Sequence, residues 1–333
     1  MSQQIFSIPP HENFLEKLVE GVIDGSLLGD WERSGPFWLS DVTIILPTRR
    51  ARLALSSAFA KAMGGATLLP DIRTLGVEDD EENAFNLAEQ DQTQLSAIGE
   101  FDRRFLLSSL VEQWLKNREI ENQKATTQDG IPDIDGAKII GLADSLAKLI
   151  DDIIVEEIDP NAIRALPELE LDAEKHQDLA KNFEQNLEFL EIALTAWPQI
   201  LQERSQIDPS AEKVIRAAKQ SQNLAQIFGD RPVIVAGSTG SVAATAKLLK
   251  AIVGLKRGFL VLPGFDINLS AKGQESLLDL TNSPHGHPQY GMCQLLKRLK
   301  TTPEMVVELA TENSVRTNLV RDALVLAPDT SQW

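Results

Sequence analysis

Short apolar runs, each followed by a helical pattern, constrain the fold of this chain more than any other feature. Four such runs lie toward the two ends of the sequence, at residues 5–8, 41–46, 231–236 and 258–262. The second is almost continuously apolar, which is typical of parallel strands buried on both faces. Strand followed directly by helix is the order found in doubly wound sheets. The pattern therefore predicts an α/β fold built on a parallel sheet.

The middle of the chain has a different character, with helical periodicity almost throughout and clustered Pro and Gly between the periodic stretches. We expect an all-helical insertion there, of about five or six helices. The predicted organisation is a first part of the α/β domain at 1–82, the helical insertion at 83–228, a second part of the α/β domain at 229–300, and a polar connector at 301–333. Because the chain ends just after this connector, without a closing strand or helix, we expect it to be truncated.

Composition limits the function classes. The 333 residues hold 32 Lys and Arg against 49 Asp and Glu, a net charge of -17, which argues against a free-standing, high-affinity nucleic-acid binder but leaves room for a local basic groove. The single Cys293 cannot form an internal disulfide, and no apolar run is long enough to cross a bilayer. We expect a cytoplasmic protein without a cofactor, in which His285 and His287 belong to a loop rather than a metal site.

The first strand-to-helix turn, residues 8–14, is where an open α/β domain would hold a nucleotide phosphate. It has no Gly, no Lys and no Ser or Thr, so the Walker pattern GxxxxGK[ST] is absent. Pro9 and Pro10 also remove two backbone donors. We therefore predict that this turn binds no phosphate.

A second candidate for anion binding is the turn after the third apolar run, formed by Gly237, Ser238, Thr239, Gly240 and Ser241. A glycine-rich turn that opens a helix can cradle an anion. The same residues also suit an ordinary strand-helix turn, in which Gly avoids steric conflict and Ser caps the helix. The strand before it ends without the Asp-Glu pair that an ATPase would use to hold magnesium and orient water.

The third candidate is basic. Thr48, Arg49, Arg50 and Arg52 follow the second apolar run and open its helix. Open α/β domains bind ligands at the carboxyl edge of the sheet, and Arg makes bidentate contacts with phosphate. We predict that these four residues contact a DNA backbone; ion pairing with the acidic middle segment is the alternative, and Arg52 could also lie on a solvated helix face.

No residues are predicted to be catalytic. The acidic pairs Asp151-Asp152 and Glu156-Glu157 lie in a helical stretch without a neighbouring His, Lys or glycine-rich turn, so solvent exposure explains them as well as a metal would. We expect no metal site.

Six strings resemble a known family in order and spacing. They are IFSIPP near the start, DVTIILPTRRARLAL, LLPDIRTLG at 68–76, VIVAGSTGSVAATAKLLKAI, GFLVLPGFD at 258–266 and HPQYGMCQLLKRL at 287–299. Together they are similar to AddB, the double-strand break repair protein of alphaproteobacterial type, over essentially the whole chain. AddB is one subunit of the AddAB helicase–nuclease, which resects broken DNA ends for homologous recombination.

The resemblance implies a P-loop-NTPase-like domain of the superfamily 1 helicase kind, interrupted by a helical subdomain and carrying a degenerate phosphate loop. It implies an AddA-type helicase–nuclease subunit and single- or double-stranded DNA as partners. Residues 47–51 match the segment after the second motor strand, and residues 237–241 fall near the position of the acidic metal motif of an active helicase. The nuclease domain of the family, with its iron–sulfur cluster, matches nothing in this chain, so we expect no enzyme activity from this portion alone.

The sequence is thus compatible with three functions. The first is a non-catalytic module that guides DNA and binds the partner motor subunit. The second is a nucleotide-binding enzyme that uses residues 237–241 as an unorthodox phosphate loop. The third is a protein-interaction scaffold, suggested by the charge of -17.

Overall fold

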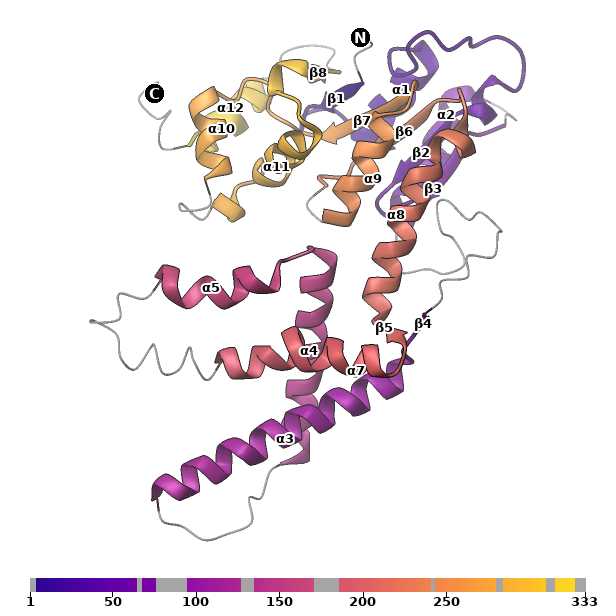
Figure 1. The fold of residues 1–333 in the computed structure, drawn as a ribbon. Helices are drawn as coiled ribbons and strands as arrows, with labels where there is room; N and C mark the ends of the chain where they lie inside the picture. The colour runs from indigo at the N-terminus through magenta and orange to yellow at the C-terminus, as the bar shows by residue number, and fades with distance from the viewer. Residues whose placement is uncertain are drawn as a thin grey trace. The chain divides into compact units, whose positions relative to one another are not determined.

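A computed structural model describes residues 4–64, 68–75, 95–126, 135–170, 186–240, 243–279, 284–309 and 315–326. The chain divides into two compact units (Figure 1). Unit 1 combines residues Met1–Ala88 with Ala217–Trp333, and unit 2 is the continuous stretch Glu89–Arg216.

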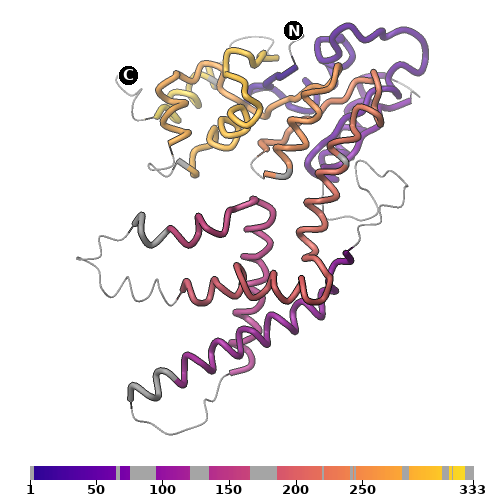
Figure 2. Tube along the Cα trace, in the orientation of Figure 1, coloured from indigo at the N-terminus to yellow at the C-terminus, as the bar shows by residue number. Residues whose placement is uncertain are grey.

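Unit 1 is built on a six-stranded sheet with the order β3-β2-β6-β7-β1-β8, and every neighbouring pair is parallel. Strands far apart in sequence lie side by side, as the indigo and orange traces of β2 and β6 show in Figure 2. The predicted α/β class and parallel sheet are confirmed. The strands are β1 (Ile5–Ile8), β2 (Thr43–Leu46), β3 (Asp71–Thr74), β6 (Val233–Ala236), β7 (Gly258–Pro263) and β8 (Val307–Glu308).

Helices pack on both faces of this sheet because successive side chains of a buried strand point to opposite sides. Ile44 packs in one apolar cluster with Phe59, and the next residue, Ile45, packs in another with Leu249 and Leu295. The first cluster is contributed by α1 (Phe14–Asp24) and α2 (Arg49–Met63). The second is contributed by α8 (Pro209–Phe228), α9 (Ala243–Val253), α10 (Ala271–Leu278) and α11 (Tyr290–Leu299).

Capping residues set the limits of the first two helices. The side chain of Asn13 accepts a hydrogen bond from the Glu16 amide at 3.5 Å, and the Thr48 hydroxyl accepts one from the Ala51 amide at 3.1 Å. Each helix ends at a residue in the left-handed conformation, which glycine adopts without a steric penalty. Gly25 has φ of 89° and Gly64 has φ of 66°. Gly64 is thus the C-cap of α2.

The stretch expected to be a polar connector contains secondary structure. Strand β8 pairs with β1, where Phe6 lies opposite Val307 and the Leu309 amide donates to the Ser7 carbonyl at 2.8 Å. Helix α12 (Val315–Ala323) follows, and a 3-10 turn at Pro303–Met305 precedes the strand. A strand of two residues leaves no alternating pattern in the sequence, so the sheet pairing could not be read from it.

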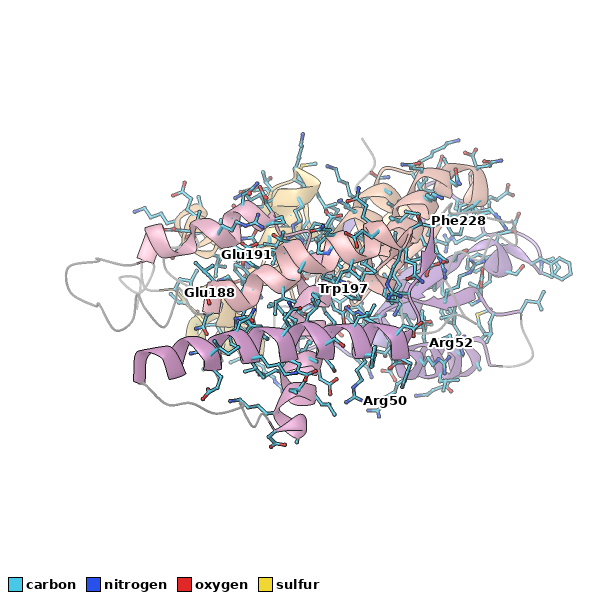
Figure 3. The ribbon with its side chains drawn as sticks, turned by 60° about the horizontal axis from the view of Figure 1, so that its bottom comes forward. Arg50, Arg52, Glu188, Glu191, Trp197 and Phe228 are labelled. Carbon is cyan, nitrogen blue, oxygen red and sulfur yellow. The ribbon has the colours of Figure 1, made fainter. Side chains whose placement is uncertain are left out.

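Unit 2 is mainly helical. It comprises α3 (Glu100–Thr126), α4 (Gly136–Val155), α5 (Pro160–Glu170), a π-helical turn η2 (Ile192–Ala196), α7 (Trp197–Glu203) and two short parallel strands, β4 (Ser96–Ala97) and β5 (Gln206–Ile207). Its core is a separate apolar cluster that includes Leu107, Val111, Leu146, Ile150 and Trp197. Figure 3 shows Glu188, Glu191 and Trp197 along one helical run.

A buried polar network ties the helices of unit 2 together. Asp208, which is 2% exposed, accepts hydrogen bonds from Arg103 Nε at 3.0 Å, Trp197 Nε1 at 3.0 Å and the Ser210 amide at 2.9 Å. Arg103 also pairs with Asp151 through a 2.9 Å contact. Asp208 and Arg103 together therefore join the start of α8 to α3, α4 and α7.

Candidate functional site

The segments singled out in the sequence meet at the carboxyl edge of the sheet. All six strands are parallel, so the turns after β1, β2 and β6 leave from the same edge. A Cβ atom built on Gly237, after β6, would lie 3.5 Å from the Phe14 ring at the start of α1 and 3.6 Å from Pro47 after β2. This is the edge at which open α/β domains bind ligands.

The basic segment after β2 lies in the first turn of α2. Arg49 and Arg50 are exposed, Arg52 is half-buried, and the Thr48 hydroxyl is occupied as the N-cap. Figure 3 labels Arg50 and Arg52. Among the described residues, Arg50 forms no ion pair. The first turn of α2 holds no acidic residue. A helix N-terminus carries partial positive charge, so these guanidinium groups add to a local positive field in a chain that is acidic as a whole.

The glycine turn after β6 uses its own donors. The Gly237 amide donates to the Val261 carbonyl at 3.0 Å, and the Gly240 amide donates to the Ser238 hydroxyl at 3.3 Å. Gly237 and Gly240 have φ of 78° and 59°. A Cβ on Gly240 would lie 2.7 Å from Leu295, so close packing also requires glycine there. Two of the amides that an anion would need are therefore engaged; Thr239 is half-buried, and Ser241 lies outside the described residues.

The turn after β1 is likewise closed on itself. The Glu12 amide donates to the Pro9 carbonyl at 3.1 Å, and the Glu16 amide is bonded by the Asn13 side chain. Together with the missing donors of the two prolines, this leaves few amides at the start of α1 for a phosphate.

A crevice that the sequence did not suggest lies beside this turn, outside the ends of β1, β7 and β8. It has a volume of about 380 Å³. We call it the carboxyl-edge crevice. Its polar lining includes Asp266, Asn268, Ser270, His287, Gln289, Glu308, Asn318, Arg321 and Asp322. These residues come from segments after β7, before α11, in β8 and in α12, and no single motif links them.

The electrostatics of the carboxyl-edge crevice disfavour phosphate. Burial raises the pKa of the Glu308 carboxyl; the neighbouring His11 and Arg321 oppose that shift, and the negative charge of Asp266 adds to it. The carboxylates of Glu308 and Asp266, which repel each other, would repel a phosphate as well.

Burial, with Asp266 nearby, also raises the pKa of the Cys293 thiol to about 12, so this cysteine is not a nucleophile at neutral pH.

Hydrogen bonds fix the tautomer of His287. Its Nδ1 accepts from the Gln289 amide at 3.2 Å, so the proton lies on Nε2, which donates to the Leu324 carbonyl at 2.9 Å. Gln289 in turn donates to the Gly264 carbonyl at 2.9 Å. His287 thereby holds the segment after α12 against the crevice. Among the described residues, no group of three His, Cys, Asp or Glu side chains is placed to hold a metal ion.

Family models and curated proteins offer no match to this chain. Within the described residues, none of the helices combines the length and the apolar character that crossing a membrane requires.

Proposed function

We propose that this chain is a non-catalytic, helicase-like module of a DNA double-strand break repair helicase–nuclease, where it helps to guide DNA and binds the partner motor subunit during end resection. The observation that carries the proposal is the exposed guanidinium pair of Arg49 and Arg50 at the carboxyl edge of a parallel sheet. The six collinear strings that resemble AddB supply the repair context.

Helix stability does not explain these arginines. A positive side chain in the first turn of a helix opposes the macrodipole, at a cost of about 0.3–1 kcal/mol each. Basic residues normally favour the last turn instead. Phosphate groups of DNA would complement both the guanidinium groups and the helix N-terminus, which accounts for this placement.

The self-contained turns support a role without catalysis. A P-loop needs free backbone amides around the phosphates, and the turns after β1 and β6 direct their amides to Pro9, Val261 and Ser238. The nucleotide-binding alternative therefore has little geometric support, and it predicts ATP binding at millimolar concentration. The helical unit between the two parts of the sheet domain fits the interrupted motor plan of the family.

The test is binding of fluorescein-labelled single-stranded DNA to the full chain at several salt concentrations. We expect weak binding that falls with salt by a log-log slope of about -0.7 for each phosphate neutralised. Changing Arg49 and Arg50 to Ala should abolish it. Lys61→Ala, at the far end of α2 and 84% exposed at its side chain, is the matched control and should leave it unchanged. Unchanged binding in the double variant would refute the contact, and no binding at low salt would favour the scaffold.

A further inference from the structure

Unit 2 contains an apolar groove that the DNA proposal does not use. It has a volume of about 610 Å³ and is lined mainly by apolar side chains of α4, η2, α7 and β5. Ile150 and Trp197 form the buried floor of the groove, at 2% and 1% exposure. Leu95 and Ile158 also line the groove but are 40% and 41% exposed. We call this surface the α4–α7 groove.

Pro198 explains how one wall of the groove is built. A proline inside a helix lacks the N–H that would bond four residues back, and its ring clashes there. Here the helix widens into the π turn η2 directly before it, and the Trp197 amide bonds to the Ile192 carbonyl five residues back. Ala193 and Leu194 of this widened turn line the groove. π turns of this kind are rare and recur at functional sites.

The opposite wall ends in a concentration of negative charge. From residue 149 to residue 163 there are five acidic residues and no basic one. Asp151 pairs with Arg103. Glu156 and Glu157 lie at the C-terminal end of α4, where the helix dipole is already negative. Glu157 also has φ of 54° and lines the groove. Negative side chains at the negative end of a helix dipole destabilise the helix, so this end of α4 favours a cationic partner.

We propose that the α4–α7 groove binds an amphipathic helix of a partner protein, one whose apolar face enters the groove and whose flanks carry Lys or Arg. A groove between helices suits a helix with anchors at i, i+3 or i+4, and i+7. The acidic end of α4 selects basic flanks by charge complementarity. A second copy of this chain is a poorer occupant, because two molecules of charge -17 repel each other.

The proposal rests on the partner-binding part of the proposed function, and its test is separate from the DNA measurement. The full chain is titrated with a fluorescein-labelled helical peptide that carries Leu on one face and Lys on the other, and with a matched peptide in which every Lys is Glu. We expect the basic peptide to bind at least about tenfold more tightly, with an affinity that weakens as salt rises.

Variants locate the binding surface. Ile158→Gln replaces an apolar rim side chain with a polar, uncharged one of similar size and should weaken binding of the basic peptide at least about tenfold. Ile140→Gln is the matched control, on the same helical unit, 46% exposed and outside the groove, and should change binding less than about twofold. Charge reversal at Glu156 should weaken the basic peptide as well.

Several outcomes would overturn the inference. These are no binding of either peptide, equal loss in Ile158→Gln and Ile140→Gln, and equal affinity for the two peptides. A concentration-dependent dimer that Ile158→Gln abolishes in sedimentation runs would assign the groove to a second copy instead. Loss of DNA binding in Arg49→Ala/Arg50→Ala with intact peptide binding would separate this proposal from the DNA contact.

Discussion

Removing the Asp208 carboxylate should destabilise unit 2 more than any surface change. Asp208→Ala deletes three hydrogen bonds and leaves the indole N–H of Trp197 buried without an acceptor. An unsatisfied buried polar group costs about 1–3 kcal/mol. Breaking a buried ion pair costs about 3–5 kcal/mol, but Arg103, 12% exposed at its side chain, keeps Asp151 as a partner. We therefore expect a loss of about 4 kcal/mol.

Hydrogen exchange measured by mass spectrometry on the intact chain is the suitable assay, because a chain of two units need not unfold in one step. Peptides from α3, α4 and α7 should exchange about a thousandfold faster in Asp208→Ala. The control is Asp144→Ala, which breaks the pair between Arg104 of α3 and Asp144 of α4. Both side chains of that pair are more than half exposed, at 57% and 52%, so the loss should be about 0.2–1 kcal/mol. Equal exchange in the two variants would refute the reasoning.

Two further predictions concern single side chains. A Cβ on Gly258 would lie 1.7 Å from the Ile252 carbonyl oxygen, so Gly258→Ala should lower the free energy of unfolding by about 3 kcal/mol. Gly141→Ala, in open space within α4, should raise it by about 0.5–1 kcal/mol, and an alanine tolerated at residue 258 in thermal unfolding would contradict the packing. For Glu308, the folded-state pKa is raised above 4.5, so the folded chain binds more protons than the unfolded chain just above that value and loses stability as pH rises. Glu308→Gln removes this effect, so the melting temperature of the variant should rise relative to that of the wild type between about pH 4 and about pH 7. A difference in melting temperature that stays the same across this pH range would count against the prediction.

Local signals in the sequence were sufficient for most of the sheet domain. Strand β2 was recognisable because burial on both faces makes it continuously apolar, and α2 because Thr48 caps it and Gly64 ends it. Strand β8 escaped notice since two residues carry no period, and its pairing with β1 depends on hydrogen bonds across about 300 residues of chain. The short strands β4 and β5 of unit 2 were missed for the same reason.

The candidate site shows where local reasoning reaches its limit. Arg49 and Arg50 could be placed at the carboxyl edge because strand, cap and helix are consecutive in sequence. The glycine turn could not be judged in this way. Whether its amides face an anion depends on the Val261 carbonyl from another strand, and the need for glycine at residue 240 depends on Leu295, which lies on α11. Glycine is equally suited to cradling a phosphate and to close packing against leucine. Only tertiary contacts separate these two uses, and here the contacts favour packing.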